Sequence, residues 1–282
     1  MQPIALKFLI VTAYSSDDIP EFTGEDELFK SKEALTQQLP IAGAFSPLYY
    51  NSQGIGLITT GMGIANASAS MMAIGLSHLV DLTDCYIIIA GIGGLMPSKG
   101  RLGTVVCLRH VINGLCFEID PRECSEEKTF YKEKLPWLTG TERFTLNQPL
   151  VNKCQQIICT HSNVDCIVGD GLSMDAYWHG KRLAQWAEHW TNQWCADSTP
   201  KTKNEGDFCI SDMENSGILT ACMRLADAKR CHFEKVIAIR TASNYVYEPD
   251  VAPQDSITKH DSFSLAVEQT YHAVKAIMEN LD

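Results

Sequence analysis

The chain has 282 residues, of which 45% are hydrophobic and 20% are charged, a composition typical of a globular protein with a substantial core and not of a disordered chain. Its formal net charge of -11 repels phosphate backbones and anionic lipid, so no nucleic acid or membrane surface is expected as a partner. Small polar ligands remain compatible, because a binding site can carry a few cations against this background.

Cysteine and histidine usage bears on the compartment and on metals. The chain has 11 cysteines, an odd number with no C-x-x-C pair, scattered through apolar segments. Together with the lack of a signal peptide, this pattern predicts a cytoplasmic protein that uses cysteine as a small hydrophobic residue. No histidines have the spacing of zinc ligands, so no metal site is predicted.

The apolar stretches are short. The longest uncharged one, 85–97, is about half as long as a transmembrane helix, and its Gly and Pro residues disfavour a helix. We therefore expect no membrane span.

Short apolar runs and amphipathic segments alternate along the chain. Runs that are bounded by turn residues and apolar on both faces predict buried strands at 6–12, 55–60, 86–90, 104–108, 166–168, 208–211 and 236–240. Helices are predicted at 27–38, 65–79, 148–160, 181–194, 214–228 and 262–280. We expect a single α/β domain over residues 1–282, with a mixed, largely parallel central sheet flanked by helices.

Two regions interrupt this alternation. Segments 117–145 and 196–206 are rich in charged residues, Pro and Thr, and they predict surface insertions that could serve as lids or subunit contacts. Neither has the composition of an interdomain linker.

Two glycine motifs follow predicted strands. In 59–67, a Gly turn opens a helix of small residues, where backbone N–H groups can approach an anion. A dinucleotide site would need G-x-G-x-x-G with an acid such as Asp81 further on, but Asn66 stands at the third Gly position. In 87–97, a buried strand enters a Gly cluster that can present main-chain groups to a ligand. A purely structural turn or hairpin is the alternative in both places.

A third motif covers 169–180. Around Ser173 it is G-x-S-x-D and not the G-x-S-x-G of a nucleophile elbow, which argues against an esterase-type serine triad. The adjacent Tyr177 and Trp178 offer a stacking face for a heterocyclic base. Aromatic core at the start of a helix is the alternative interpretation.

Polar residues follow two further strands. Glu214 comes after 208–211, and an ionised carboxylate accepts two hydroxyl hydrogen bonds at once, as the cis-diol of a ribose requires. Asn244 follows 236–240, and its amide can pair with the N7 and O6 edge of a purine. The alternatives are an acid that favours the helix dipole and an ordinary turn asparagine.

Taken in order, these motifs resemble the purine nucleoside phosphorylase and uridine phosphorylase superfamily, specifically its purine nucleoside permease branch. The resemblance runs from Lys7 to Asn244, and its most specific pieces are 173–180, 211–214 and 240–244. It implies a nucleoside phosphorylase-like fold and a purine nucleoside as ligand, with no metal or organic cofactor. The branch name implies transport, but the lack of a membrane span favours an enzyme or a nucleoside-binding protein.

The resemblance also implies roles for individual residues. Met213 and Glu214 would hold the ribose. Tyr177, with Trp178 beside it, would cover the base, and Asn244 would contact purine N7. The other positions expected to bind substrate are Gly91, Gly93, Asp175 and Ser243.

Departures from the superfamily bear on the reaction. Part of the superfamily has an Asp that protonates the leaving base, whereas Asn244 can only hydrogen-bond; a similar Asn accompanies 6-oxopurines such as inosine and guanosine. Phosphorylases place Arg and Thr around phosphate, but Ile89 and Ile92 stand in that segment here. Hydrolysis is therefore slightly favoured over phosphorolysis, which would need inorganic phosphate. Nucleosidases position the water with a carboxylate after the first strand, and Asp17, beside Asp18, falls close to that place.

The expected function is cleavage of the N-glycosidic bond of purine nucleosides in purine salvage. Glu214 would hold the ribose, Asn244 would stabilise the departing purine, and Asp17 would position the water. The alternative is a catalytically weak nucleoside-binding or transport-associated protein. Because superfamily members usually pair subunits at the active site, a homo-oligomer is expected.

Overall fold

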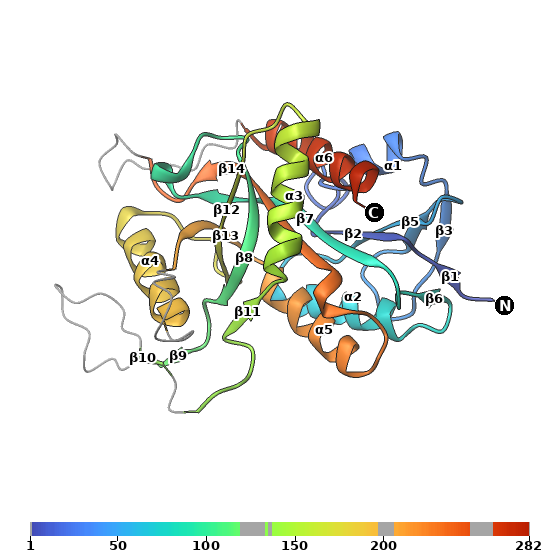
Figure 1. Ribbon diagram of the computed structural model, residues 1–282, viewed down its shortest axis with the longest axis horizontal. Helices are drawn as coiled ribbons and strands as arrows, with labels where there is room; N and C mark the ends of the chain where they lie inside the picture. Colours follow the sequence, from blue (N-terminus) through green and yellow to red (C-terminus); the bar gives the residue numbers. More distant parts are fainter. Residues whose placement is uncertain (1, 119–132, 135–136, 197–205, 249–261, 282) are drawn as a thin grey trace.

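The structure of the protein is a computed structural model that describes residues 2–118, 133–134, 137–196, 206–248 and 262–281. Its centre is a ten-stranded sheet (Figure 1). From one edge to the other the strands are β11 (Arg143–Thr145), β8 (Val105–Asn113), β12 (Cys166–Ser173), β13 (Phe208–Asp212), β7 (Tyr86–Leu95), β2 (Phe8–Thr12), β5 (Ile55–Thr59), β4 (Leu48–Tyr50) and β3 (Gln37–Leu39). β14 (Val236–Tyr245) lies off this path and pairs with both β7 and β8.

The sheet is mixed. β7 pairs in parallel with β2 and β14, and β12 pairs in parallel with β8 and β13. Antiparallel pairs join β13 to β7 and β14 to β8. The two edges of the sheet are also antiparallel, with β11 on β8 at one edge and β3, β4 and β5 at the other. Because β2 and β14 both run parallel to β7, the carboxyl ends of these three strands lie at the same end of the sheet. Ser211 of β13 pairs with Gly94 there. Two short strand pairs, β1 (Ile4–Ala5) with β6 (Val80–Asp81) and β9 (Phe117–Glu118) with β10 (Glu133–Lys134), stand apart from the main sheet.

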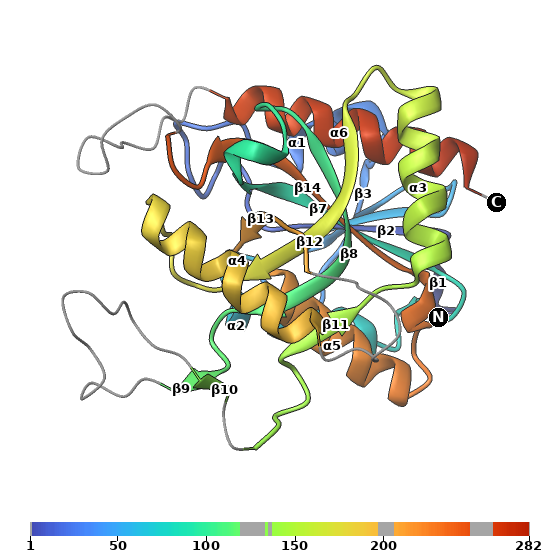
Figure 2. The ribbon, with the colours of Figure 1, turned by 60° about the vertical axis from the view of Figure 1, so that its left-hand side comes forward.

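Helices cover both faces of the sheet. α2 (Ile64–Leu76) and α5 (Asn215–Asp227) pack together on one face (Figure 2). The opposite face carries α1 (Glu27–Lys32), α3 (Gln148–His161) and α6 (Phe263–Asn280), and α4 (Lys181–Ala196) packs on β12 and β13. A Cβ on Gly217 would lie 2.3 Å from the carbonyl oxygen of Ile64, so glycine permits the close approach of α5 to α2.

The core explains why the strands have continuous apolar sequences. β2 and β5 are buried at every position, as expected for strands covered on both faces. A second apolar cluster lies under α4, where Trp190 and Trp194 pack near Phe208 of β13. The two Trp side chains are four residues apart and therefore share one face of the helix.

The predicted fold class is confirmed: a mixed sheet is flanked by helices on both faces. The helices predicted at 65–79, 148–160, 181–194, 214–228 and 262–280 are present as α2 to α6. The helix predicted at 27–38 is wrong beyond α1, because Ala34 adopts a left-handed φ of 50° and the chain then enters β3. Glu33 turns into the core there, where the Tyr271 hydroxyl donates to it at 2.8 Å.

Several strands are longer than predicted. Those expected at 86–90, 104–108, 166–168 and 236–240 continue as β7, β8, β12 and β14. These strands are central and paired on both sides. Hydrogen bonds to the neighbouring strands therefore keep the backbone extended at Gly and polar residues. Asn244 therefore stands inside β14 and not in a turn.

The predicted insertions at 117–145 and 196–206 lie largely outside the described residues. The described end of the first, β11, pairs antiparallel with β8 at the edge of the sheet. Among the described residues, none of the helices combines the length and apolar character needed to span a bilayer.

Candidate active site

A cavity of about 120 Å³ opens where β2, β7, β13 and β14 end. Strand ends of this kind are where α/β proteins bind ligands. The lining combines backbone at 92–94 with the charged side chains of Glu25, Glu214 and Arg240. Aromatic and other apolar side chains form the rest of the wall.

Glu214 stands between β13 and α5, immediately before the first helical residue. One carboxylate oxygen accepts a hydrogen bond from the backbone N–H of Gly63 at 3.2 Å, and the other lies 3.2 Å from Nη2 of Arg240. The side chain is buried and lines the cavity. Each carboxylate oxygen has two lone pairs, so the group can still accept hydrogen bonds from two ligand hydroxyls.

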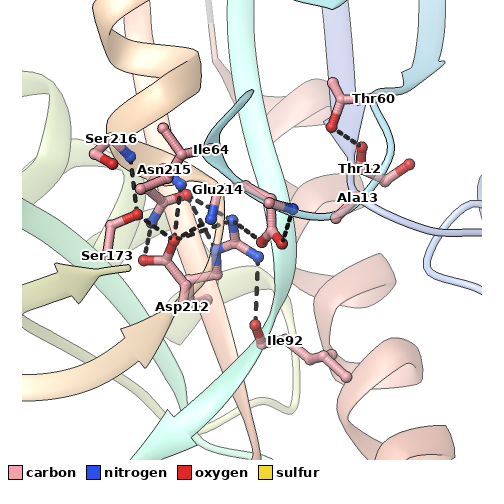
Figure 3. Close-up of polar contacts among 12 residues, drawn as sticks. Thr12, Ala13, Thr60, Ile64, Ile92, Ser173, Asp212, Glu214, Asn215 and Ser216 are labelled. Carbon is pink, nitrogen blue, oxygen red and sulfur yellow. Dashed lines mark hydrogen bonds and ion pairs between the residues drawn. The ribbon is translucent and has the colours of Figure 1, made fainter. Parts of the chain in front are cut away.

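Asp212 fixes the turn that presents Glu214 to the cavity. Its Oδ1 accepts from the backbone N–H groups of Glu214 at 2.9 Å and Asn215 at 2.7 Å. Nδ2 of Asn215 and Oγ of Ser173 also donate to Asp212, at 2.8 and 3.0 Å. Oγ of Ser173 accepts in turn from the N–H of Ser216 at 3.0 Å. Figure 3 shows these groups converging at the start of α5, so β12, β13 and α5 together restrict the position of Glu214.

Arg240 of β14 is a buried cation, with 2% of its surface exposed. Its Nε and Nη2 donate to Oδ1 of Asn215 at 3.1 and 2.7 Å, and Nη1 donates to the carbonyl oxygen of Ile92 at 3.3 Å. Nη2 also lies 3.6 Å from Asp212 and 3.2 Å from Glu214. The guanidinium thus ties the ends of β7, β13 and β14 into one charged cluster.

Glu25 is the third carboxylate of this cluster. Its oxygens accept from the backbone N–H groups of Ala13 at 2.7 Å and Ile92 at 2.8 Å. A Cβ on Gly91 would lie 2.7 Å from Oε1 of Glu25 and 2.3 Å from Nη1 of Arg240, so both side chains pack onto this glycine. Glu25 thereby brings a loop carboxylate to the same cavity as the strand-end charges.

The charged cluster holds more negative than positive groups. Burial raises the pKa of Glu25, although Arg240 and backbone donors oppose this effect. Burial also raises the pKa of Glu214 to about 7; Arg240 lowers it, whereas Asp212 and Glu25 add to the increase. Three carboxylates that share one guanidinium attract a proton or another cation. A carboxyl that titrates near neutral pH is suited to proton transfer.

A bulge in β14 turns two adjacent residues toward the cavity. The register with β7 shifts between Ala242 and Asn244, and both Ser243 and Asn244 line the cavity although neighbours in a regular strand face opposite sides. Oγ of Ser243 donates to Oδ1 of Asn244 at 2.9 Å, and Nδ2 of Asn244 donates to the carbonyl oxygen of Tyr245 at 3.1 Å. The amide of Asn244 is therefore held in a defined orientation.

The apolar wall includes Met62, Tyr177, Trp178 and Phe263. Tyr177 is 57% exposed, whereas the ring of Trp178 is stacked 6.3 Å from that of Phe208, centroid to centroid. Flat, largely apolar surfaces of this kind suit a heterocyclic base.

The structure brings most of the predicted site residues together. The cavity is lined by Gly93, Tyr177, Trp178, Met213, Glu214, Ser243 and Asn244. Gly91 stands behind the lining, where its lack of a side chain makes room for Arg240 and Glu25.

Two predicted residues lie elsewhere. Asp17 is exposed on the loop after β2 and is not part of the cavity lining. Asp175 accepts a hydrogen bond from the backbone N–H of Ile64 at 2.6 Å, so it caps the start of α2 and does not line the cavity. The loop after β2 folds back towards the end of that strand, so the carboxylate that it brings to the cavity is Glu25 and not Asp17.

Sequence reasoning missed Glu25 and gave Arg240 no role. For Arg240 a signal existed, because a lone cation in an apolar strand must have anionic partners if the strand is buried. Glu25 carries no comparable signal, since it lies in a loop without periodicity. Only the fold brings it to the cavity.

The Gly turn at 59–67 serves the charged cluster. The backbone N–H groups that open α2 are engaged by protein carboxylates, Gly63 with Glu214 and Ile64 with Asp175. Gly63 has a φ of 90°, a conformation that favours glycine. This helix N-terminus therefore positions Glu214 and leaves no place for a dinucleotide phosphate.

A separate cluster under α4 has the composition of a metal site. In the described part of the chain, His110, Asp170 and Cys195 could hold an ion. Arg109, however, donates to both oxygens of Asp170 at 2.9 and 3.1 Å, and the backbone N–H of Asp207 donates at 2.6 Å. A carboxylate already neutralised by a guanidinium is a poor ligand for a divalent cation, so we interpret this cluster as structural.

The family model for purine nucleoside permease matches residues 5–166 and 160–282. The chain belongs to the purine nucleoside permease family. A probable purine nucleoside permease of Schizosaccharomyces pombe is 25% identical over 279 residues, covering 81% of this chain and 76% of that protein. The purine nucleoside permease of Candida albicans is 22% identical over 236 residues, and the match covers 68% of this chain but only 54% of that relative.

Solved structures similar to this permease-family chain include a nucleosidase and a futalosine hydrolase. A 5′-methylthioadenosine/S-adenosylhomocysteine nucleosidase from Neisseria meningitidis, in complex with methylthio-immucillin-A, has a TM-score of 0.65 at 16% identity, covering 98% of this chain and 100% of that one. Futalosine hydrolase of Helicobacter pylori has a TM-score of 0.64 at 11% identity, covering 98% of each chain. This member of the purine nucleoside permease family therefore has the fold of these two enzymes.

Proposed function

We propose that the protein hydrolyses the N-glycosidic bond of purine nucleosides to free base and ribose. The observation that carries this proposal is the group of three carboxylates, Glu25, Asp212 and Glu214, around the single guanidinium of Arg240 at the cavity. Such a cluster favours the positive charge that develops on a ribose as its glycosidic bond breaks. The nucleosidase fold supports the same reaction.

Glu214 would hold the sugar. In its ionised form it accepts hydrogen bonds from the 2′ and 3′ hydroxyls, which become more acidic as the ribose gains positive charge. The bonds from Gly63 and Arg240 fix both carboxylate oxygens before the ligand arrives. This preorganisation lets the interaction strengthen in the transition state without rearrangement of the site.

Glu25 would activate the water. Its carboxylate is held by two backbone N–H groups, and its raised pKa makes it a better proton acceptor than an exposed glutamate. Water attacks C1′ and gives its proton to Glu25, while the electron pair of the broken C–N bond leaves with the base. Arg240, packed beside Glu25 on Gly91, would help to orient that water.

The charge of the cavity disfavours phosphorolysis. Among the described lining residues Arg240 is the single cationic side chain, and it already faces Glu214 and Asp212. A phosphate dianion would experience repulsion of about 4 kcal/mol for each pair of unit charges 4 Å apart at an effective dielectric constant of about 20. Ile92, which lines the cavity, supplies no side-chain donor in compensation.

A product assay tests the proposal. The purified chain is incubated with inosine, guanosine and adenosine, with and without inorganic phosphate, and free base and ribose are quantified. We expect base and ribose in equal amounts without phosphate. Base release that requires phosphate would establish a phosphorylase instead.

A nucleoside-binding or transport-associated protein is the second candidate. It is favoured by Asn244, an amide in place of a proton donor, and by the permease names of the relatives. Calorimetric binding of a nucleoside that is recovered intact after long incubation would support this candidate against hydrolysis.

We further propose a cytoplasmic protein that assembles as a homo-oligomer. The ten described cysteines are free thiols, and nine of them are buried, which supports a reducing compartment. At the rim of the cavity Met62 and Tyr177 are 41% and 57% exposed, and Phe45, packed on Gly61, is 53% exposed, which supports a second copy covering this face. Light scattering on the purified chain tests the assembly, and a monomer at all concentrations would contradict it.

A further inference from the structure

Apart from the charged cluster, the described lining of the cavity holds no carboxyl or imidazole that could protonate a leaving base. The ionisable groups of the described lining, apart from the charged cluster, are Tyr14 and Tyr177. The Tyr14 hydroxyl donates to the carbonyl oxygen of Thr23 at 3.2 Å, and burial raises its pKa, so it holds its proton. His179 lies outside the lining, and burial lowers its pKa despite the attraction of Glu248, so it carries no spare proton at neutral pH.

Asn244 cannot replace the missing acid. Its Oδ1 accepts from Ser243 and its Nδ2 donates to Tyr245, so the group is a fixed, neutral amide. A neutral purine nucleoside releases its base with an extra electron pair, and the base needs a proton or a strong donor to carry it. That negative charge would develop beside the three carboxylates of the cluster, which makes its departure still less favourable.

The same cavity is well suited to a cation. Glu25, Asp212 and Glu214 outnumber Arg240 by two charges when all are ionised. Tyr177 and Trp178 also line the cavity, and aromatic rings attract cations. A positively charged heterocycle would therefore meet two kinds of favourable partner in this cavity, carboxylates and aromatic rings.

We propose that the preferred substrates are ribosides of a cationic heterocycle, in which the ring bonded to C1′ already carries the positive charge. This inference rests on the proposed hydrolysis. Water forms a bond to C1′, the C1′–N bond breaks, and its electron pair neutralises the ring. The base leaves as a neutral molecule without protonation, and the proton of the water passes to Glu25. The products are ribose, neutral base and one proton, so neither an acid at Asn244 nor another reactant is needed.

Two kinds of compound share this chemistry: N7-alkylated purine ribosides and pyridinium ribosides. The kinetic arms of the test are guanosine, 7-methylguanosine at mildly acidic pH, and nicotinamide riboside. We expect kcat/KM for at least one cationic riboside to exceed that for guanosine by about 100-fold. The arm that is cleaved faster identifies the ring. Hydrolysis of guanosine as fast as both cationic ribosides would overturn the inference and leave the proposed function standing.

A variant distinguishes the effect of the cavity on the rate from the intrinsic chemical lability of cationic ribosides. Asn244→Asp supplies the missing proton donor, so we expect kcat on guanosine to rise about 100-fold and the preference for 7-methylguanosine over guanosine to fall at least about tenfold. Asn163→Asp, at an exposed position in the turn after α3, is the matched control and should change neither. Equal effects of Asn244→Asp on both substrates would overturn the inference.

Binding of uncleavable bases gives a readout without turnover. 7,9-Dimethyladenine and 9-methyladenine differ by one methyl group and one positive charge, and we expect the cation to bind at least about tenfold more tightly. Glu214→Gln, which removes one negative charge, should reduce this preference. Equal affinity of the two bases would overturn the charge preference. Preferential binding of the cation without cleavage of any riboside would instead overturn the hydrolysis on which the inference rests.

Discussion

Two buried charge clusters, one at the cavity and one under α4, contain similar groups in opposite electrostatic states. Under α4, burial opposes ionisation of Asp170, but the hydrogen bonds from His110 and Arg109 outweigh it and hold the pKa of that carboxyl below its ordinary value. At the cavity, burial raises the pKa of Glu214 to about 7 even though Arg240 lies 3.2 Å away. Each carboxylate faces an arginine, yet one is stabilised as an anion and the other is not.

The number of donors for each carboxylate accounts for this difference. Arg109 donates to both oxygens of Asp170, and this carboxylate accepts further hydrogen bonds from His110 and the Asp207 N–H. Around Arg240, three carboxylates share one guanidinium and border open space. A cluster whose negative and positive charges balance contributes to stability. A cluster with excess negative charge can bind a cation or take up a proton. We therefore expect substitutions in the two clusters to have opposite consequences.

The largest effect is expected from Glu25→Gln, which keeps the shape of the side chain but removes the proton acceptor. We expect kcat to fall about 1000-fold with KM little changed. Steady-state kinetics on the fastest substrate provide the measurement. Asp17→Asn, an exposed position on the same loop, is the matched control and should change kcat by less than about twofold. A larger effect of Asp17→Asn than of Glu25→Gln would restore Asp17 as the catalytic carboxylate.

Glu214→Gln should lower kcat/KM about 100-fold, because an amide cannot accept two hydroxyl hydrogen bonds with the strength of a carboxylate. A substrate that lacks the 2′ hydroxyl separates binding from other effects. The wild-type protein should discriminate against this substrate, and the variant should largely lose that discrimination. Undiminished discrimination in the variant would show that Glu214 does not hold the sugar.

Asp170→Asn should act on stability and not on the reaction. Removing this anion leaves Arg109 partly buried without its partner, and we expect the free energy of unfolding to fall by about 3 kcal/mol. Activity per folded molecule should stay within about twofold of wild type. Urea unfolding monitored by tryptophan fluorescence gives the first quantity and active-site titration the second. A selective loss of kcat would mean that the two clusters are coupled.

The two clusters should also respond to pH in opposite directions. Folding raises the pKa of Glu214 towards about 7, so its contribution to stability is present at low pH and is lost as pH rises through that value. Folding lowers the pKa of Asp170, so its contribution is present at neutral pH and is lost as pH falls through the folded-state pKa. The unfolding free energy should be measured across the pH range. Its dependence on pH should become weaker near neutral pH in Glu214→Gln and weaker at acid pH in Asp170→Asn.

Activity should follow ionisation of the cavity cluster. Because Glu214 must be ionised to accept both sugar hydroxyls, we expect kcat/KM to rise with pH to a plateau above about 7. Glu25, Asp212 and Arg240 face the same group, so the apparent value belongs to the cluster. A rate that falls over this range would show that the protonated form is the active one.

The sequence predicted those parts of the molecule that local pattern determines. The period of α6 and the apolar run of β2 are set by burial on defined faces, so they can be read without tertiary information. Glu214 comes directly after a recognisable strand and Asn244 lies near the end of another, and both line the cavity. The ends of β14 and β7 were less predictable. Hydrogen bonds to neighbouring strands keep their polar residues and glycines in the sheet, although such residues would otherwise end a strand.

The parts that were not predicted depend on long-range contacts. Glu25 reaches the cavity through hydrogen bonds to Ala13 and Ile92, and neither partner can be inferred from the residues around it. Asp175 looked like a ligand contact but caps α2, 111 residues earlier in the chain. Arg240 was visible as a cation in an apolar strand, but its three anionic neighbours come from other elements.

A titration of the reaction with inorganic phosphate shows directly whether excess negative charge at the cavity selects water as the nucleophile. Initial rates of base release are measured from zero to high phosphate, and the sugar product is identified by ³¹P NMR. We expect full activity at zero phosphate, no ribose 1-phosphate, and at most weak inhibition by phosphate. A rate that starts at zero and saturates with phosphate while ribose 1-phosphate accumulates would contradict it.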